Sequence, residues 1–439
     1  MEPITAVIMA TFLMLILMAI GVPIYASLGV SGVVGLIGLK GLGFALAQLK
    51  TYPYMHAADY LMLVVPMFIL MGYLAFAGGL SKDAYIIANK WLSKLPAGLA
   101  IATVMACAGF GACCGSSVAC SATMGRVAIP EMLERGYDRK IAAGTVAAGG
   151  LLGIMIPPSV ILVFYGAITE VSVGKMLIAG IIPGILTAAV FCLGLLMLSR
   201  QDPSLCPSPM EVSWLERIKS LRLFWGVGVL FIIVIGGIYG GVVTPTEAAA
   251  VGAFASFIMY LLKCPREERA QIPGKVWDAL KETLNTCGMI FIILIGSGLF
   301  SFFMTLAGVP ALVNAWAAGL DIPSIFIVAV FLLIMIPMGM FLDPFSILVI
   351  TLPITFPVVV KTFGYDPLWY GILCTLLIQI GLITPPVGLN AYIMKGVCPD
   401  MPLEDIFKGC NWFIFFTIIV VVLVLLFPQL TTWLPSKVQ

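Results

Sequence analysis

Charged side chains are scarce in this sequence. Asp, Glu, Lys and Arg together make up 10% of the 439 residues, whereas hydrophobic residues make up 61%. A water-soluble fold of this length cannot bury so much apolar surface, and the apolar residues gather in runs long enough to cross a bilayer. The composition therefore predicts a polytopic membrane protein in contact with lipid. The net charge of +2 is scattered over the segments between these runs, so nothing indicates a nucleic-acid partner.

Histidine and paired cysteines are also scarce. The single histidine, His56, has no partner motif, and an interfacial position explains it better than catalysis. The eleven cysteines form no CxxC pair and no metal-binding spacing; most lie beside Ala and Gly, which is typical of buried small residues. An intramembrane enzyme would need a Ser–His pair or two catalytic aspartates, and neither is evident. The sequence therefore does not predict an enzyme.

The first apolar run, Ile4–Ile20, lacks the features of a signal peptide. It has no basic leader and no small-residue cleavage site, so it predicts a retained helix. Charged stretches separate the later runs. Of these, Lys263–Lys281 is charged and amphipathic and precedes a span at Thr283–Leu306, and Ser81–Lys94 and Pro310–Asp321 are expected to be surface connectors.

The sequence does contain two interrupted apolar segments. Gly149–Gly166 is broken by Pro157-Pro158, and Gln379–Lys395 by Pro385-Pro386. Two prolines inside a helix remove two backbone donors and clash with the preceding turn. Hydrocarbon tolerates such a break only where the freed carbonyls are buried in protein or line a cavity. Paired breaks in two halves of a chain point to the binding site of a secondary transporter, whereas a packing kink is the alternative.

Two other stretches are predicted to form re-entrant helical hairpins. Ala97–Leu133 is longer than one span and has Gly115-Ser116-Ser117 near its middle; a single helix packed through small residues is the alternative. Pro323–Val360 has Gly339–Pro344 at its middle. Its Asp343 is either a functional intramembrane carboxylate or a cap on the following half-helix. Arg126, inside the first stretch, must reach water or an acidic partner.

The second half of the sequence repeats the first at an offset of 228 residues. Each half therefore predicts a span, a surface connector, a hairpin, a polar turn, a broken helix and a final span. The features that recur at this offset are Gly136-Tyr137-Asp138 with Gly364-Tyr365-Asp366, Gly153 with Gly381, Pro157-Pro158 with Pro385-Pro386, and Gly115-Ser116-Ser117 with Asp343-Pro344-Phe345.

Positive charge predicts the orientation of these halves. If both hairpins are re-entrant, 17 basic residues fall on one side of the membrane and five on the other, with Arg126 inside a hairpin. The richer side is then cytoplasmic and both termini are outside. The first hairpin enters from the cytoplasm and the second from outside, which is an inverted repeat. The five basic residues of the poorer side are Lys40, Lys50, Lys175, Lys361 and Lys437.

The two breaks offer ligands for a hard cation. Main-chain carbonyls and helix C-terminal ends can coordinate a small cation, while helix N-termini face an anion. All-oxygen ligation favours Na⁺, and a proton relay is disfavoured because the broken segments contain no Asp, Glu or His. The side chains that supplement the carbonyls are Ser116, Ser117, Ser159, Asp343, Thr384 and Asn390.

Three motifs resemble those of a known family. They are GGLLGIMIPPSVILVFYGAITEVSVGKMLIAGIIPGI, TPTEAAAVGA and GLITPPVGLN. Over essentially its whole length, the chain resembles the large membrane subunit (M subunit, dicarboxylate type) of the tripartite ATP-independent periplasmic (TRAP) transporters. The resemblance implies an all-α membrane fold with an elevator mechanism, in which hairpins and broken helices slide against a scaffold. It also implies symport of an organic anion, a carboxylate, with two or more Na⁺ ions across the bacterial inner membrane.

The resemblance further implies partners and a division of the chain. The partners are a small membrane subunit (Q type) and a periplasmic substrate-binding protein (P type). Residues 97–175 and 323–405 would form the transport domain. Residues 1–96, 176–322 and 406–439 would form the scaffold, its two surface arms and the last span. A stand-alone Na⁺/dicarboxylate symporter of the wider elevator class is the alternative function.

Transferred to this sequence by motif, the resemblance implies two Na⁺ sites and one substrate site. Each Na⁺ would lie between a hairpin tip and the break of the same half, and the substrate carboxylate between the two tips. Arg126 would be its counter-ion, or would only extend to water from the far end of the hairpin. The implied Na⁺ ligands are Ser116, Ser117, Gly153, Ile156, Pro158, Gly339, Asp343, Gly381, Thr384 and Val387. The implied substrate residues are Gly115, Ser116, Arg126, Pro157, Ser159, Asp343, Pro385 and Asn390.

Overall fold

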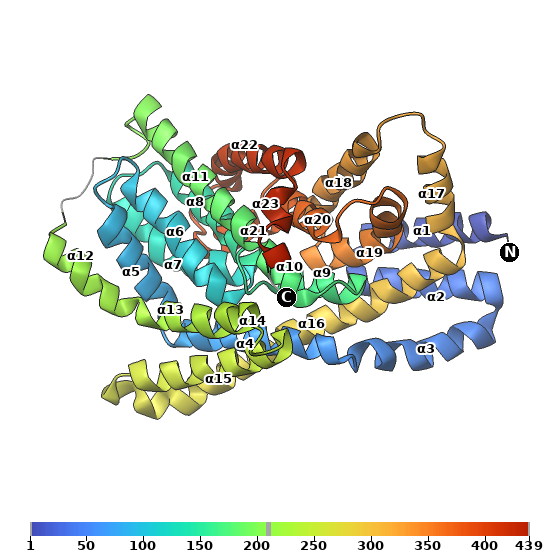
Figure 1. Ribbon diagram of the computed structural model, residues 1–439, viewed down its shortest axis with the longest axis horizontal. Coiled ribbons are helices and arrows are strands. Elements are labelled where there is room, and N and C mark those ends of the chain that lie inside the picture. Colours follow the sequence, from blue (N-terminus) through green and yellow to red (C-terminus); the bar gives the residue numbers. More distant parts are fainter. Residues whose placement is uncertain (1, 208–211, 438–439) are drawn as a thin grey trace.

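The computed structural model describes residues 2–207 and 212–437 and builds them from helices (Figure 1). No strand occurs among these residues. Seven helices in this part of the chain are long and apolar enough to cross a bilayer, or eight if the bent pair Trp214–Leu223 and Trp225–Tyr239 is one span. The chain is therefore a multi-pass membrane protein, as its composition predicts. The side chain of His56, in α3, lies outside the described part.

The helices follow one another with short connections. Those of the first half are α1 (Pro3–Ala19), α2 (Ile24–Lys40), α3 (Leu42–Ala57), α4 (Val64–Ala77), α5 (Leu80–Leu92), α6 (Gly98–Cys114), α7 (Ser117–Glu134), α8 (Arg139–Leu151), α9 (Val160–Thr169), α10 (Val173–Ala179) and α11 (Ile181–Gln201). Those that follow are α12 (Trp214–Ser220), α13 (Trp225–Phe231), α14 (Gly237–Tyr239), α15 (Pro245–Lys263), α16 (Ile272–Leu306), α17 (Val309–Ala318), α18 (Ser324–Phe341), α19 (Pro344–Phe356), α20 (Pro367–Leu382), α21 (Leu389–Val397), α22 (Leu403–Leu426) and α23 (Gln429–Thr432).

One predicted boundary is wrong. The sequence predicts a span that begins at Thr283, after the charged amphipathic stretch Lys263–Lys281, but α16 begins at Ile272 and runs unbroken through 35 residues. Its one proline, Pro273, lies in the first turn, where the missing N–H has no helical partner to lose. The later charged residues belong to the exposed first turns of the same helix. The polar end of α16 and its apolar span therefore form one continuous rod.

Both predicted hairpins are pairs of helices joined by a tight turn. In the first, Gly115 ends α6 with φ +62°, a left-handed conformation that glycine adopts easily. Ser116 then begins α7 in an extended conformation and accepts a hydrogen bond from the N–H of Ala119 at 3.4 Å. The alternative of one continuous packing helix is therefore wrong. In the second, Leu342 is extended and Asp343 caps α19, with Pro344 in its first turn.

Both double prolines interrupt a helix for several residues. After α8 the chain forms a short 3₁₀ turn at Leu152–Ile154 and becomes helical again only at α9. Between α20 and α21 the interruption extends from Ile383 to Gly388. Both X-Pro bonds within the pairs are cis. A simple packing kink does not describe either segment, because the helical hydrogen bonds stop on one side of the prolines and begin again on the other.

The polar turn before each broken helix has the same structure in both halves. Asp138 caps α8 by accepting hydrogen bonds from two backbone N–H groups, and Asp366 caps α20 in the same way. The preceding tyrosine reaches the start of its own hairpin. The Tyr137 hydroxyl accepts a hydrogen bond from the N–H of Leu99 at 3.2 Å, and burial raises the pKa of Tyr137 to about 12. The Tyr365 hydroxyl lies 3.1 Å from that of Ser324.

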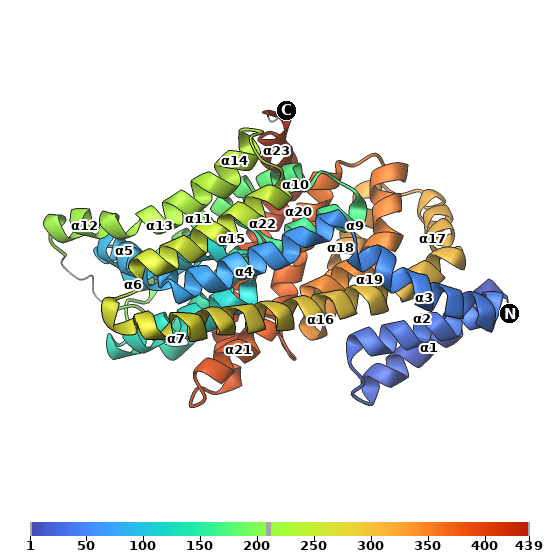
Figure 2. The same ribbon diagram turned by 90° about the horizontal axis from the view of Figure 1, so that it is seen from below.

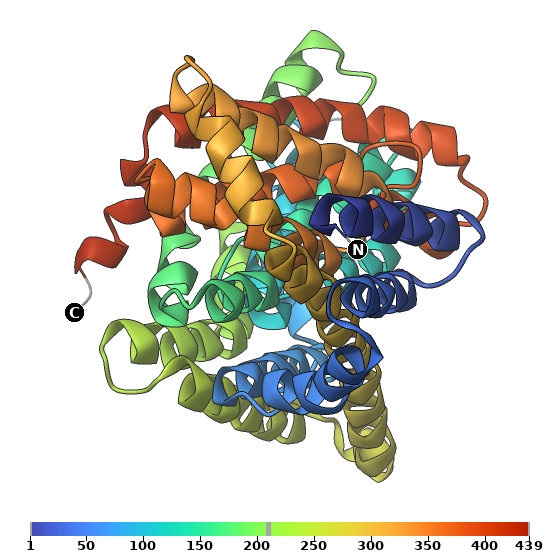
Figure 3. The ribbon, with the colours of Figure 1, turned by 90° about the vertical axis from the view of Figure 1, so that its right-hand side faces the viewer.

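Equivalent connectors of the two halves lie far apart. Helix α5, with α12 beside it, is at the left end of the molecule, whereas α17 is at the right end near the N-terminus (Figures 1 and 2). Helices α1 and α2 pack on one another, and α2 packs along α16 (Figure 3). The main buried core gathers instead around the hairpins, the broken helices and α22. The hairpins and broken helices therefore contribute to the largest buried cluster among the described residues.

Candidate functional site

Each hairpin packs against the break of its own half through a pair of glycines. A Cβ atom on Gly111 would lie 2.7 Å from the Cα of Gly153, and one on Gly339 would lie 2.9 Å from the Cα of Gly381. Real Cβ atoms do not approach other atoms so closely, so these backbones can meet only where both residues are glycine. The second pair follows the first at the repeat offset of 228. Each tip is thus pressed against the main chain of a break.

A backbone hydrogen bond holds tip and break together in both halves. The N–H of Val160 donates to the carbonyl of Gly115 at 3.3 Å, and the N–H of Gly388 donates to the carbonyl of Met340 at 3.1 Å. At the first break, a Cβ on Gly153 would also lie 2.9 Å from the carbonyl oxygen of Ser116. Main-chain oxygens of the tip therefore stand directly beside the unwound segment.

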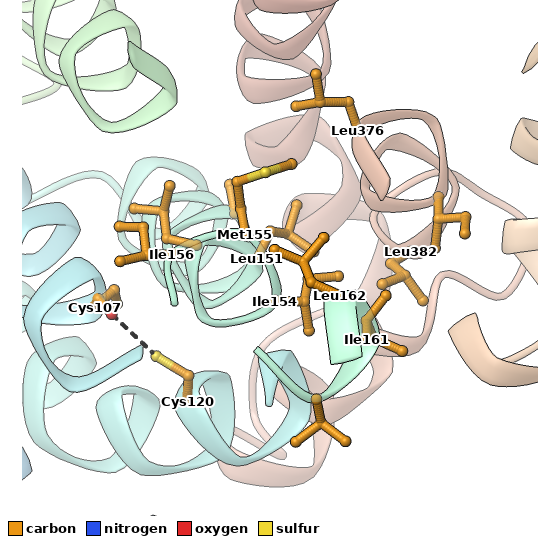
Figure 4. Packing of buried hydrophobic residues seen from close by; sticks show 14 of the residues in the cluster. Cys107, Cys120, Leu151, Ile154, Met155, Ile156, Ile161, Leu162, Leu376 and Leu382 are labelled. Atoms are coloured by element: carbon orange, nitrogen blue, oxygen red, sulfur yellow. Dashed lines mark hydrogen bonds between the residues drawn. The ribbon is translucent and has the colours of Figure 1, made fainter. Parts of the chain in front are cut away.

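The two breaks differ in their surroundings. Residues 151–160 are all buried, and Figure 4 shows Leu151 and Ile154 in one apolar cluster with Leu376 and Leu382 of α20. The second break is more open, since Pro385 and Pro386 are exposed. Of the other predicted Na⁺ residues, Ser117, Gly339 and Gly381 are buried, whereas Thr384 and Val387 are half-buried.

Several predicted site side chains are used in local hydrogen bonds. Ser159 donates to the carbonyl of Ile154 at 2.7 Å and caps α9, and the Thr384 hydroxyl donates to the carbonyl of Ile380 at 2.6 Å. The Asp343 carboxylate accepts from two backbone N–H groups of α19 at 2.9 and 3.0 Å and from the hydroxyl of Ser346. The sequence left two interpretations of Asp343 open, and these hydrogen bonds are the ones expected of a helix cap.

A cavity of about 810 Å³ brings the two hairpin tips together. From the first half Ser116 and Arg126 line it, and from the second Asp343 and Leu389. Helices α4 and α16 form the opposite wall. A cavity of this size holds a small metabolite. The predicted residues that do not line it are Gly115, Ser117, Gly153, Ile156, Pro157, Pro158, Ser159, Gly339, Gly381, Thr384, Pro385, Val387 and Asn390.

Arg126 faces this cavity from α7. It shares one helix face with Ala119, Ala122 and Thr123, which also line the cavity at helical spacing. Helical side chains lean toward the N-terminus of their helix, which here is the hairpin tip. The Arg126 side chain is exposed, and it makes no ion pair within residues 2–207 and 212–437. It is thus a cation without an ion pair on the cavity-facing side of α7, about 15 Å along the helix from Ser116.

Asn390, a predicted substrate residue, does not line the cavity between the tips. It is fully buried, and its amide nitrogen donates to the hydroxyl of Ser121 and to the carbonyl of Ala147, both at 3.1 Å. Sequence reasoning also missed Gln379, whose amide nitrogen donates to the carbonyl of Leu151 at 3.0 Å. The sequence signal that could have identified Gln379 is the presence of an uncharged amide side chain in an otherwise apolar broken segment. Both side chains tie the second half to α8 of the first.

A second cavity, of about 820 Å³, lies beyond the other end of the broken helix α9. It is lined by Tyr60, by Glu170 and Lys175 after α9, and by Thr244 before α15. Thr244 and Glu247 of the TPTE motif form a capping box that starts α15. The sequence did not indicate this cavity, because its walls come from three separate connections and from the helices α3, α16 and α19. The one lysine among its lining residues, Lys175, is one of the five basic residues that the charge pattern assigns to the poorer side, whereas Lys275 lines the cavity at the tips.

The sequence matches one protein family over most of its length. The family described as "Tripartite ATP-independent periplasmic transporter, DctM component" matches residues 11–430. The C4-dicarboxylate TRAP transporter large permease protein DctM of Vibrio cholerae is 33% identical over 98% of both chains. Its namesake in Pseudomonas aeruginosa is 34% identical over 93% of this chain and 94% of its own.

Two further proteins extend the comparison. The isethionate TRAP transporter permease protein DctMQ of Oleidesulfovibrio alaskensis is 33% identical over 89% of this chain but 60% of its own length. Among solved structures, the YdaH transporter of Alcanivorax borkumensis superimposes with a TM-score of 0.64, covering 97% of this chain and 98% of its own. At 14% identity this likeness concerns the fold alone.

Proposed function

Because this chain belongs to the DctM family of tripartite ATP-independent periplasmic transporter components, we propose that it is the large membrane subunit of a Na⁺-coupled importer of an organic anion. Its named relatives are permease proteins, not enzymes. They differ in cargo, since C4-dicarboxylates and isethionate both occur in their names. The family therefore establishes the transport function, and the cargo has to be argued from the site.

The observation that carries this proposal is the cavity between the two hairpin tips. It combines a free guanidinium, that of Arg126, with the N-terminal ends of α7 and α19 at Ser116 and Asp343. Helix N-termini and an arginine both favour an anion. The carboxylate would bind between the tips, and Arg126 would be its counter-ion.

Na⁺ would be a second transported substrate at the breaks. In the first half, the close glycine contact brings the hairpin against the 3₁₀ turn that follows α8. In the second half, it lies in the last turn of α20, directly before the unwound segment 383–388. Carbonyl oxygens of such unwound segments are available to a cation. One ion would lie among Ser116, Ser117 and the segment 153–158. The other would lie among Gly339, Asp343 and the segment 381–387. Oxygen ligands of this kind suit a hard cation.

We further propose an elevator cycle between two inverted halves. The connectors α5 and α17, equivalent in sequence, lie at opposite ends of the molecule (Figures 1 and 2). The large cavities lie on different sides of the broken helices. Residues 97–175 and 323–405 would slide as the transport domain against the remaining helices, so that the tips face the cytoplasm and the periplasm in turn.

The complete importer would contain two further proteins. A small membrane subunit would extend the scaffold in the bacterial inner membrane, and a periplasmic binding protein would deliver the anion. The name DctMQ, carried by a relative longer than this chain, supports a close association of large and small subunits.

Reconstitution tests this function. Proteoliposomes containing this chain and the small subunit would receive the binding protein outside, together with radiolabelled organic acids and either NaCl or choline chloride. We expect uptake of at least one carboxylate that needs Na⁺ and all three proteins. Uptake by this chain alone would favour the stand-alone symporter instead. Uptake that ignores the Na⁺ gradient would overturn the proposed coupling.

A further inference from the structure

Some of the charged residues that line the cavity between the tips form ion pairs, and others do not. Five charged residues line it, namely Arg126, Lys275, Asp278, Glu282 and Asp343. Lys275 already pairs with a glutamate outside the cavity at 2.7 Å, and Asp278 lies 3.4 Å from Lys281. Asp343 accepts the hydrogen bonds of its own helix. In the part of the chain that the structure describes, only Arg126 and Glu282 face the cavity without a partner.

The two unpaired charges belong to different parts of the protein. Arg126 is on α7, in the half-site with the first hairpin, whereas Glu282 is on α16, near the polar end of that long helix. Asp278 lies one turn before Glu282 on the same face and also lines the cavity. The cavity is thus lined by an unpaired cation from α7 and by an acidic patch, Asp278 and Glu282, from α16.

Apolar side chains make up most of the remaining lining. They come from both hairpins and from α4 and α16. Apolar side chains cannot solvate a charged group, so they disfavour a second charge on the cargo. The largest of them are Ile69, Phe76, Phe110, Met289, Phe345 and Leu389.

From this distribution we infer that the cargo carries one carboxylate on an apolar body and that the site discriminates against C4-dicarboxylates. One guanidinium can hold one carboxylate through two parallel hydrogen bonds. A second carboxylate would share the cavity with Asp278, Glu282 and Asp343, whose like charge disfavours it. The other cation of the lining, Lys275, is already paired, and the rest of the lining is largely apolar. The inference rests on the proposed function, and it departs from the cargo named for the relatives in Vibrio and Pseudomonas.

The test is direct binding to the membrane complex, because a periplasmic binding protein would impose its own selectivity on uptake. The detergent-solubilised complex of this chain with its small subunit would be titrated calorimetrically in NaCl, with choline chloride as the control. The probes are 4-methylpentanoate and phenylacetate against succinate and fumarate. We expect Na⁺-dependent binding of at least one monocarboxylate, with a Kd at least tenfold lower than that of either dicarboxylate.

Two substitutions make the assignment specific. Arg126→Gln should weaken monocarboxylate binding roughly ten- to hundredfold, because a charge-assisted pair is lost, whereas Arg126→Lys should keep part of the affinity. Glu282→Gln should strengthen succinate binding several-fold and leave monocarboxylates nearly unchanged. Arg222→Gln, at an exposed arginine remote from the cavity lining, is the matched control and should alter neither.

The outcomes separate this inference from the function on which it rests. Succinate or fumarate bound as tightly as the monocarboxylates, in Na⁺, would overturn the inferred cargo and leave Na⁺-coupled anion import intact. If Glu282→Gln leaves dicarboxylate binding unchanged, Glu282 is not the reason for the discrimination against dicarboxylates. Absence of Na⁺-dependent binding by any acid would refute the proposed function together with the inference.

Discussion

The side-chain amide of Gln379 donates a hydrogen bond to the carbonyl oxygen of Leu151, and these two residues are 228 positions apart. That separation is the offset of the repeat, so equivalent positions of the two halves touch each other. Leu151 is the last residue of α8, where carbonyls lose their helical partners. Gln379 therefore donates to a carbonyl at the point where α8 gives way to the 3₁₀ turn Leu152–Ile154, and it joins the broken helices of the two halves.

Loss of this link should destabilise the protein. Gln379 is fully buried, so Gln379→Leu removes its hydrogen bond to the Leu151 carbonyl, and we expect the free energy of unfolding to fall by about 0.5–1.5 kcal/mol. Thermal unfolding of the purified complex measures this as a lower Tm. Gln271→Leu, at an exposed glutamine, is the control and should change the Tm little. Equal Tm values for both variants would show that the hydrogen bond contributes nothing.

The close glycine contacts between hairpin and break should be essential for the Na⁺ dependence of uptake. Gly153→Ala would bring a Cβ within 2.9 Å of the Ser116 carbonyl, and Gly381→Ala within 2.6 Å of the Cα of Gly339. We expect each variant to separate tip from break, and so to raise the Na⁺ concentration for half-maximal uptake at least several-fold. Gly288→Ala, where a Cβ meets nothing within 4 Å, is the control. Wild-type Na⁺ dependence in both variants would contradict ion sites at these contacts.

Hydroxyl groups at the predicted ion sites provide a gentler test. Thr384→Val keeps the shape of the side chain, and Ser117→Ala removes one oxygen from the first tip. We expect each to raise the Na⁺ requirement for uptake, because a hard cation loses an oxygen ligand. Thr375→Val is the matched control, since its hydroxyl makes the same kind of bond, at 2.9 Å to the carbonyl of Gly371, away from both breaks. An unchanged requirement in both site variants would remove the site assignment.

Removal of Na⁺ should lower the stability of the folded complex. An ion that binds only the folded state stabilises it by about 2.7 kcal/mol when present at a hundred times its Kd. We therefore expect the Tm to rise with NaCl but not with choline chloride at equal ionic strength. Gly153→Ala and Gly381→Ala should each reduce this rise. A Tm that depends equally on both salts would point to a general ionic-strength effect instead of specific binding.

Local sequence signals predicted much of this protein. Apolar runs identified a multi-pass membrane protein, and the three motifs identified the family, which the match to residues 11–430 confirms. The double prolines and the tip at Gly115 predicted where helices stop. These features act within a few residues of the chain, through ring geometry, left-handed backbone or a missing N–H. The continuous α16 escaped prediction, because polar residues outside a span do not end a helix by themselves.

The sequence by itself determined that two halves carry equivalent breaks and tips, because the residues that terminate helices recur at one offset. Only the tertiary structure decided which side chains meet. It placed Arg126 and Glu282 around one cavity, and it buried Asn390 against α8. These pairs are separated by more than a hundred residues, and their approach depends on how whole helices pack. No periodicity or capping signal along the chain contains that information.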